Sequence, residues 1–166
     1  MPQEYSFDLT AGFEKQELVN ALDQLKREVS TRFDFKGVHV DVNLASDQSN
    51  ITFTTIHEAK IIALIDILEN KLIKRNLSLA ILDKSALIEP ASGGLVKKII
   101  PLVLRLSTEQ AKDISKDLRQ NFPKAKASIQ GETVRISSKS KDELQDIITY
   151  LKKCHSNLPL VFDNYR

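Results

Sequence analysis

The 166-residue sequence has no tryptophan, a single cysteine and few aromatic residues. With Cys154 as its only thiol, the chain cannot form an internal disulfide. Any base-stacking pocket must depend on Phe33, Phe35 or a similar residue, because aromatic side chains make up only 6% of the composition. The sequence also lacks a glycine-rich phosphate loop of the Walker or Rossmann type and the Lys/Arg-Gly-aromatic pattern of RNA-recognition modules. These absences argue against a P-loop enzyme and against RNA reading by stacked bases on a sheet.

Long apolar runs and strong net charge are missing as well. The longest apolar window, residues 61–68, is interrupted by Asp66 and is shorter than the ~20 residues that span a bilayer. No N-terminal segment combines basic residues with an apolar run, so we expect a cytoplasmic protein. The formal net charge of +2 suits a small anionic ligand or a short stretch of nucleic acid better than a long duplex.

Catalytic and metal-binding patterns are weak. His39, His57 and His155 are scattered along the chain, and Cys154 beside His155 has no zinc-ligand spacing. Adjacent side chains on a helix diverge, so this pair does not form a nucleophile and its base. We expect Cys154 to be buried as a small apolar side chain. The sequence therefore predicts no catalytic residue, no metal and no cofactor.

The first half of the chain predicts six elements in the order strand, helix, strand, strand, helix, strand. Apolar and polar residues alternate in residues 5–10, 38–44 and 51–56, which is the period of half-buried strands. Residues 77–82 are expected to form the last, apolar strand. The apolar residues at helical spacing are Leu18, Leu22, Leu25 and Val29 in the first helix, and Ile61, Leu64, Ile65, Leu68 and Leu72 in the second.

The second half repeats this order. Residues 99–106 predict a strand, and Pro101 favours an edge or an irregular start for it. Alternating residues 127–137 around Gly131 predict a hairpin, and residues 160–162 the closing strand. Two helices lie between them, each opened by a predicted capping box. The boxes are Ser107 with Gln110 and Ser140 with Glu143, and the apolar residues are Ala111, Ile114, Leu118 and Phe122, then Leu144, Ile147, Ile148 and Leu151.

The repeated β-α-β-β-α-β order is typical of ferredoxin-like folds. Each strand has one consistently apolar side, so both helices should cover one face of an antiparallel four-stranded sheet. We predict an α+β fold of two such domains. The Pro-, Ser- and Gly-containing residues 90–94 mark the boundary, which makes the domains 1–90 and 95–166.

The uncovered sheet faces should be polar. Each could be solvated, pack against its twin or bind a ligand. The expected residues are His39, Asp41, Asn43, Thr52 and Thr54 in the first half, and Lys126, Ser128, Gln130, Thr133, Arg135 and Ser137 in the second.

Several runs resemble signatures of the bacterial YajQ family. The clearest are residues 31–37 (TRFDFKG) and 128–136 (SIQGETVRI). The others are residues 6–8, the helix of residues 64–77 with its basic run 71–75, residues 139–145 and residues 158–166. Together they span nearly the whole chain in the order of the family.

This resemblance implies two ferredoxin-like domains that exchange their first strands. Residues 5–10 would complete the sheet of the second unit, and residues 99–106 that of the first. The domains would then be 11–90 plus 95–106, and 1–10 plus 107–166. The resemblance also implies binding of purine nucleotides, transfer RNA or, as in some members, cyclic di-GMP. In some members it implies transcriptional control through a protein partner. It implies no enzymatic reaction.

The first candidate binding segment is Arg32 to Gly37. Cationic donors next to a glycine suit a phosphate, because glycine lets the backbone approach closely. Phe33 or Phe35 could stack on a purine. The alternative is that both rings join the helix to the sheet, while Asp34 pairs with Arg32 or Lys36.

Two further basic groups are candidates for nucleotide binding. Lys71, Lys74 and Arg75 share one helix face, although the helix dipole favours cations there regardless of function. Arg135 and Lys139 belong to the second hairpin, where Arg135 could contact a phosphate with two hydrogen bonds. The alternative for Arg135 is a surface ion pair with a residue such as Glu132.

We therefore expect a non-catalytic nucleotide-binding protein with a regulatory role. Its ligand would be a purine nucleotide (GTP, ATP or cyclic di-GMP) or a short RNA or tRNA. The alternative is a protein-interaction adaptor, acting with a partner such as a transcription regulator, in which nucleotide binding is incidental. An enzyme, such as a nucleotide hydrolase, is the least favoured hypothesis.

Overall fold

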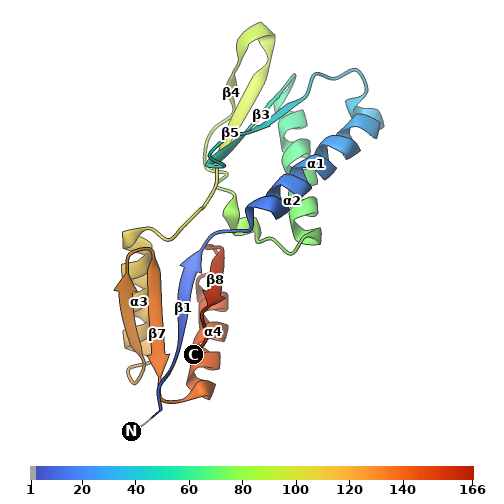
Figure 1. Ribbon diagram of the computed structural model, residues 1–166. Helices are drawn as coiled ribbons and strands as arrows, with labels where there is room; N and C mark the ends of the chain where they lie inside the picture. The colour runs from blue at the N-terminus through green and yellow to red at the C-terminus, as the bar shows by residue number, and fades with distance from the viewer. Residues whose placement is uncertain (1–2) are drawn as a thin grey trace. The chain divides into compact units, whose positions relative to one another are not determined.

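The computed structural model describes residues 3–166 and divides the chain into two compact units (Figure 1). One unit is Phe13–Val103. The other combines the residues up to Gly12 with Leu104–Arg166. We call them the central unit and the terminal unit. No helix in the described part of the chain is long and apolar enough to cross a membrane.

The central unit contains one antiparallel sheet with strand order β2-β3-β5-β4. Two long helices, α1 and α2, pack against each other beside it (Figure 1). Its elements are α1 (Lys15–Thr31), η1 (Phe33–Phe35), β2 (Asp41–Leu44), β3 (Asn50–Thr55), α2 (Glu58–Lys74), η2 (Leu79–Ile81), β4 (Glu89–Pro90), η3 (Ser92–Gly94) and β5 (Val96–Pro101).

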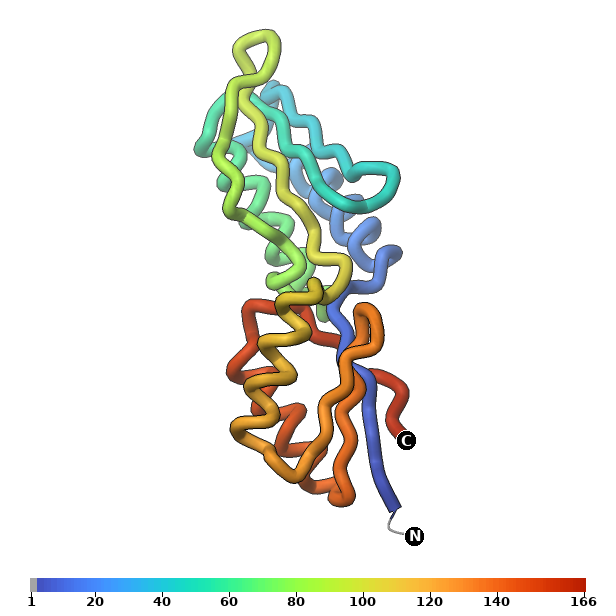
Figure 2. Tube along the Cα trace, turned by 90° about the vertical axis from the view of Figure 1, so that its left-hand side faces the viewer, coloured from blue at the N-terminus to red at the C-terminus, as the bar shows by residue number. Residues whose placement is uncertain are grey.

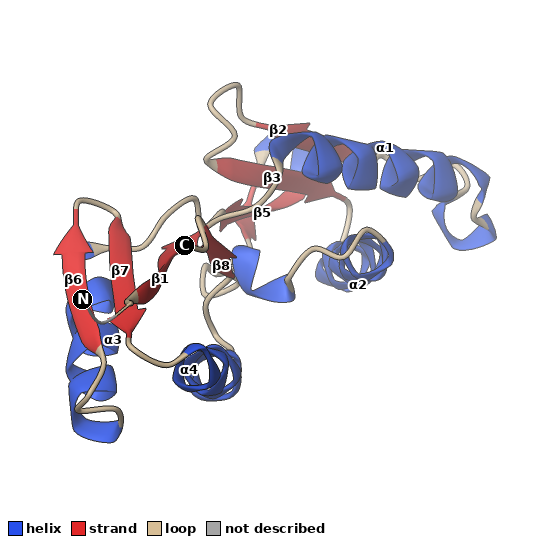
Figure 3. Ribbon diagram, turned by 60° about the horizontal axis from the view of Figure 1, so that its bottom comes forward, coloured by secondary structure: helices blue, strands red, loops and turns tan. Residues whose placement is uncertain are grey.

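The terminal unit contains the second antiparallel sheet, with strand order β6-β7-β1-β8. Helices α3 and α4 lie on one face of it (Figure 3). Its elements are β1 (Tyr5–Ala11), α3 (Thr108–Asn121), β6 (Lys126–Gln130), β7 (Thr133–Ser138), α4 (Lys141–Cys154) and β8 (Leu160–Asp163).

The two halves of the chain exchange one strand each. β1 precedes α1 in the sequence, yet it pairs with β7 and β8 of the terminal unit. β5 follows β4 and pairs with both β3 and β4 in the central unit. Each exchanged strand occupies the position of the first strand in a ferredoxin-like sheet. The predicted fold class is confirmed.

Alternation along the strands places an apolar row on the helix-covered face of each sheet. In the terminal unit, Phe7 lies opposite Ile136 and Leu9 opposite Val134, and all four side chains are fully buried. In the central unit, Ile51 and Ile100 are paired in the same way. The predicted helical residues point into these cores, because each set recurs at the spacing of one helix face.

The fourth strand of the first half is not where the sequence predicts it. Residues 77–82 contain the single turn η2 instead, because the Ser78 side chain accepts a hydrogen bond from the Ala80 N–H. Leu82 forms only an isolated bridge with Leu102. The strand in that position of the sheet is the two-residue β4.

The residues expected to separate the halves form a hairpin turn within one sheet. Residues 91–95 connect β4 to β5, and the Ala91 N–H donates to the Leu95 carbonyl at 2.8 Å. The hairpin is the yellow-green loop in Figure 2. Gly93 and Gly94 both have positive φ, which is why a turn forms here. The composition of residues 90–94 correctly predicts a turn. This turn connects two strands of the central unit and does not lie at a boundary between the units.

Three further boundaries differ from the expectation. β5 begins at Val96 and ends at Pro101, so residues 103–106 lie outside the sheet and Leu102 forms only the bridge with Leu82. β2 begins only at Asp41, because the His39 carbonyl accepts a hydrogen bond from the Thr55 hydroxyl.

Of the capping boxes, Ser107 with Gln110 is complete. At the second, the Glu143 N–H donates to Ser140, but the Glu143 carboxylate accepts from the Ser138 hydroxyl instead.

Candidate functional site

The nine predicted nucleotide-binding residues are divided between the two units. The central unit contains Arg32, Phe33, Phe35, Lys36, Lys71, Lys74 and Arg75, and the terminal unit contains Arg135 and Lys139.

The turn η1 holds its two phenylalanines in opposite environments. Phe33 is 91% exposed, whereas Phe35 is 4% exposed. The Lys60 ammonium lies 4.9 Å from the centroid of the Phe35 ring and donates to the Asp34 carbonyl. Phe35 therefore anchors the turn to the unit, and Phe33 is the aromatic ring left free to stack.

Arg32 is held by acidic neighbours. Its guanidinium donates to both carboxylate oxygens of Asp34 at 2.9 Å and lies 3.7 Å from Glu28. The hydrogen bonds from Arg32 lower the pKa of Asp34 and raise the pKa of Arg32. The two groups thus largely satisfy one another, and Arg32 offers little uncompensated charge to an anion.

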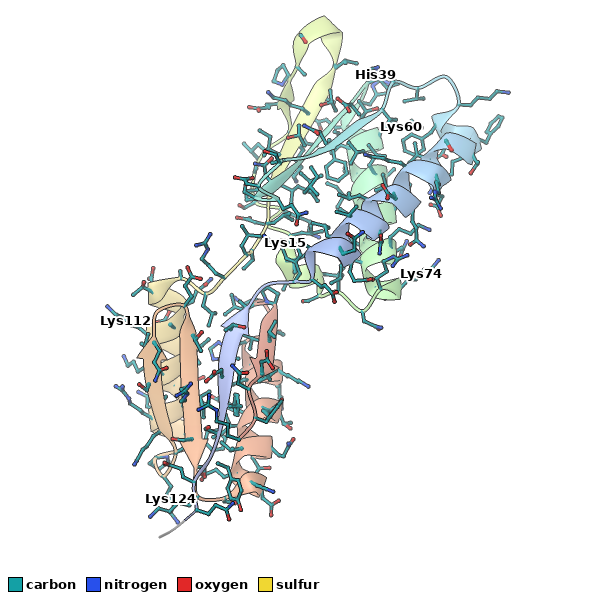
Figure 4. All side chains as sticks on the ribbon, in the orientation of Figure 1. Lys15, His39, Lys60, Lys74, Lys112 and Lys124 are labelled. Carbon is teal, nitrogen blue, oxygen red and sulfur yellow. The ribbon has the colours of Figure 1, made fainter. Side chains whose placement is uncertain are left out.

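The basic end of α2 is also paired, with carboxylates from α1. Lys71 donates to Glu28 at 2.9 Å, and Arg75 donates to Glu17 at 3.0 Å. The hydrogen bond from Lys71 lowers the pKa of Glu28. Lys74 (Figure 4) has no ion-pair partner among residues 3–166. Most of this cluster therefore joins the two helices.

A groove with a volume of about 530 Å³ lies between α1, the loop after η1 and strand β2. Its lining mixes apolar side chains with cationic, hydroxyl and carboxylate groups. The lining residues are Leu25, Lys26, Val29, Ser30, Phe35, Lys36, Gly37, Val38, Val40, Asp41 and Val42.

The position of α1 explains why this groove exists. α1 packs mainly on α2, whereas its counterpart α3 in the terminal unit packs mainly on the edge strand β6. The central edge strand β2 is consequently left with an open groove beside it.

One margin of the groove is suited to an anion. Lys26 and Lys36 are exposed, and neither forms an ion pair within the described chain. Gly37 has φ of +73°, and its N–H makes no hydrogen bond to any described residue. A main-chain N–H beside cationic side chains is a recurrent arrangement for phosphate and carboxylate groups. Sequence patterns missed Lys26, because an exposed lysine on an amphipathic helix carries no signal of its own.

In the terminal unit, Arg135 lies on the open face of the sheet. Its Nε donates to Asp8 at 3.0 Å, and Asn164 donates to the same carboxylate at 2.9 Å. These hydrogen bonds lower the pKa of Asp8 below its ordinary value of 3.8, and the bond from Arg135 has the largest effect. Glu132, the expected partner of Arg135, pairs with Arg105 instead at 2.9 Å. Arg135 therefore forms a cross-strand ion pair with β1.

Lys139 lines a different cavity, with a volume of about 390 Å³. Lys124 (Figure 4) lies there too, but so do three carboxylates, Asp142, Glu143 and Asp146. The acidic groups outnumber the cations, so this cavity does not favour an anion.

Cys154 and His155 lie in different environments. Cys154 is exposed, not buried as expected, because it lies on the outer side of the last turn of α4. His155 Nε2 lies 2.9 Å from Asp117. Asp117 also accepts from Tyr150 at 2.7 Å. In the part of the chain that is described, no three His, Cys, Asp or Glu side chains are grouped as metal ligands would be.

The fold defines an α+β protein of two ferredoxin-like units with exchanged strands. The model of the family described as "Nucleotide-binding protein YajQ-like" matches residues 5–166. The chain is 45% identical over 161 residues to a nucleotide-binding protein of Synechococcus elongatus, with 97% of each chain covered. It is 46% identical over 168 residues to one of Prochlorococcus marinus and 40% identical over 168 residues to one of Roseiflexus castenholzii, with each chain fully covered. The chain belongs to the YajQ-like family.

Proposed function

We propose that the protein binds a purine nucleotide, without transforming it, in the groove between α1 and β2. The observation that carries this proposal is a groove of about 530 Å³ that combines apolar side chains with the cationic groups of Lys26 and Lys36. Ligand sites commonly have volumes of ~300–1,000 Å³ and few polar groups. The family and its relatives bear the name of nucleotide-binding proteins.

The phosphate would occupy the margin of the groove. The Gly37 N–H and the Lys36 ammonium are consecutive donors, and Lys26 approaches from α1. No Cβ projects from Gly37, and a Cβ built there would meet nothing within 4 Å, so space for phosphate oxygens is present. Hydrogen bonds to an ionised phosphate are about twice as strong as neutral ones.

The base would pack on the apolar walls. Leu25 and Val29 of α1 face Val40 and Val42 across the groove. Asp41 and Ser30 supply an acceptor and a hydroxyl at its margin, and both can hydrogen-bond a purine edge.

A ligand with a second base could reach beyond the groove. Phe33 is fully available for stacking, as cyclic di-GMP or a short RNA or tRNA would require. The groove lining contains no histidine or cysteine, and Asp41 is its one carboxylate. Binding without turnover suits a regulatory role.

The test is a thermal-shift and calorimetry panel with GTP, ATP, cyclic di-GMP and a short RNA at two salt concentrations. A ligand that binds only the folded state raises Tm. We expect Lys36→Glu to weaken binding at least tenfold, about 1.4 kcal/mol. Lys112→Glu on α3 (Figure 4) makes the same charge change at an exposed lysine of the terminal unit and serves as the control. Equal affinities for the two variants would refute the groove as the site.

A second function, that of a protein-interaction adaptor, is favoured by one observation. The groove runs beside β2, an edge strand that pairs only with β3. Edge strands offer free backbone groups to an added strand, and the apolar side chains of the groove could contact its side chains. A partner such as a transcription regulator would then co-purify unchanged after nuclease treatment. Val40→Lys, which places a charge in the apolar wall, should abolish this association. Loss of the partner on nuclease treatment alone would contradict the adaptor.

A further inference from the structure

The terminal unit contains a small slot between the first half of α4, the start of β1 and the C-terminal residues Tyr165 and Arg166. The slot has a volume of about 140 Å³. We infer that it binds a single planar aromatic ring that carries an anionic group. Its lining residues are Tyr5, Ser6, Lys141, Leu144, Gln145, Ile148, Tyr165 and Arg166.

The size and walls of the slot fit one aromatic ring. Two tyrosines, Tyr5 and Tyr165, line it together with the buried Leu144 and Ile148 of α4. An apolar cavity of ~150 Å³ is large enough to bind benzene. Ring faces and edges also attract one another beyond the burial of their area. A second fused ring or a sugar would have to remain outside.

The charged side chains of the slot are of one sign. Lys141 and Arg166 line it, and no acidic side chain does. Neither cation forms an ion pair with any residue in the range 3–166. The Lys141 ammonium lies 4.9 Å from the centroid of the Tyr5 ring, so an aromatic face and no acid holds it in place. An anionic substituent at the mouth would therefore meet two cationic side chains.

This distinguishes the slot from the two larger cavities. The groove beside β2 includes Asp41. The cavity at Lys139 includes three carboxylates. Of these three cavities, the slot is the one with cationic and no acidic side chains in its lining.

The outer wall of the slot is held in place by the sheet. The backbones of Ser6 and Arg166 exchange hydrogen bonds at 2.9 and 3.3 Å. Asn164 donates to the buried Asp8 at 2.9 Å, and the Tyr165 ring lies 6.1 Å from the ring of Phe7. Tyr165 nevertheless remains 60% exposed, so part of this wall is free to cover a ligand. A preformed wall lowers the ordering cost of binding.

Two sources can supply this chemistry. A pyrimidine nucleotide presents one ring with its phosphate, and a simple aromatic phosphate presents the same groups without a sugar. Gln145 and Ser6 offer an amide and a hydroxyl for the edge of a pyrimidine. UMP and phenyl phosphate are therefore the probes.

The test is titration of the full chain, labelled with nitrogen-15, by NMR. We expect the amide signals of Ser6 and Gln145 to shift with both probes if an aromatic ring and an anion are enough for binding. If binding also requires hydrogen bonds to the pyrimidine edge, these signals shift with UMP alone. Lys141→Glu and Tyr165→Ala should each weaken binding at least tenfold. Lys153→Glu, at an exposed lysine of α4 outside the slot, should leave it unchanged.

Two results would overturn the inference. One is the absence of shifts at Ser6 and Gln145 at millimolar concentrations of both probes. The other is an equal affinity for Lys141→Glu and Lys153→Glu, with the remaining amide signals showing that both variants are folded. Lys36→Glu serves as a further control, since it alters the other unit. Binding retained in that variant separates the slot from the proposed groove site.

Discussion

Asp8 joins the exchanged strand β1 to its host unit, and replacing it by alanine should destabilise that unit measurably. The carboxylate is nearly buried and accepts hydrogen bonds from Arg135 of β7 and from Asn164 after β8. It therefore connects three segments that lie far apart in the sequence.

The magnitude follows from these two bonds. A hydrogen bond to a charged group contributes about 1.5–3 kcal/mol when it is buried. The Arg135 side chain is 34% exposed and recovers water when Asp8 is removed, so its contribution lies below that range. We expect Asp8→Ala to lower the free energy of unfolding by about 2–3 kcal/mol.

The chain offers a selective assay. Its three tyrosines are Tyr5, Tyr150 and Tyr165, all in the terminal unit, and it has no tryptophan. Tyrosine fluorescence during urea unfolding therefore reports on the unit that contains Asp8. The control is Asp66→Ala, at an exposed carboxylate of α2 in the central unit.

The effect should also depend on pH. Because the pKa of Asp8 is below its ordinary value of 3.8, its contribution is fully present above that pH. It is lost as pH falls through the lower, folded-state pKa. The difference between wild type and Asp8→Ala should thus be largest near neutral pH and shrink in strong acid. A difference below about 0.5 kcal/mol at neutral pH, or one that does not change with pH, would refute the reasoning.

Four other substitutions test local features. Ser107→Ala removes the complete capping box of α3 and should cost about 1 kcal/mol, measured by the same urea transition; an unchanged midpoint would contradict the cap. Gly12→Ala should cost at least about 1 kcal/mol in thermal melting, because Gly12 has φ of +147° and a Cβ would lie 3.0 Å from the Leu104 carbonyl oxygen. Gly131→Ala, with open space around it, should cost less. The hydrogen bond to Asp117 raises the pKa of Tyr150 above its ordinary value of 10.0, so stability should fall as pH rises above 10, where the unfolded phenol ionises. Tyr150→Phe should remove this alkaline loss and the last phenol step of an ultraviolet titration.

Local pattern alone determined the helices and most strands. The spacing of Leu18, Leu22 and Leu25 specifies one buried face, and the alternation around Phe53 specifies one buried side of a strand. These periods follow from backbone geometry, so no partner needs to be known. The family resemblance, confirmed over residues 5–166, rests on the same local residues.

The predicted site shows the limit of that approach. Sequence patterns proposed Lys36 and Phe33 because both lie in a short basic segment that ends in Gly37. They could not show that Lys71 would meet Glu28, 43 residues away, or that Arg135 would meet Asp8, 127 residues away. Such pairs depend on which helix and strand faces adjoin after folding.

Three features lie beyond the residue pattern. Alternation in β1 would be the same in either sheet, so its place in the terminal unit, which the family resemblance implied, is seen only in its pairing with β7 and β8. The groove exists because α1 packs mainly on α2, and the slot exists because Tyr165 lies near Tyr5. The sequence by itself determined which faces are apolar and which segments are regular. The structure decided which of those faces meet. Burial against any complementary apolar surface is favourable, and only long-range packing determines which surface each face contacts.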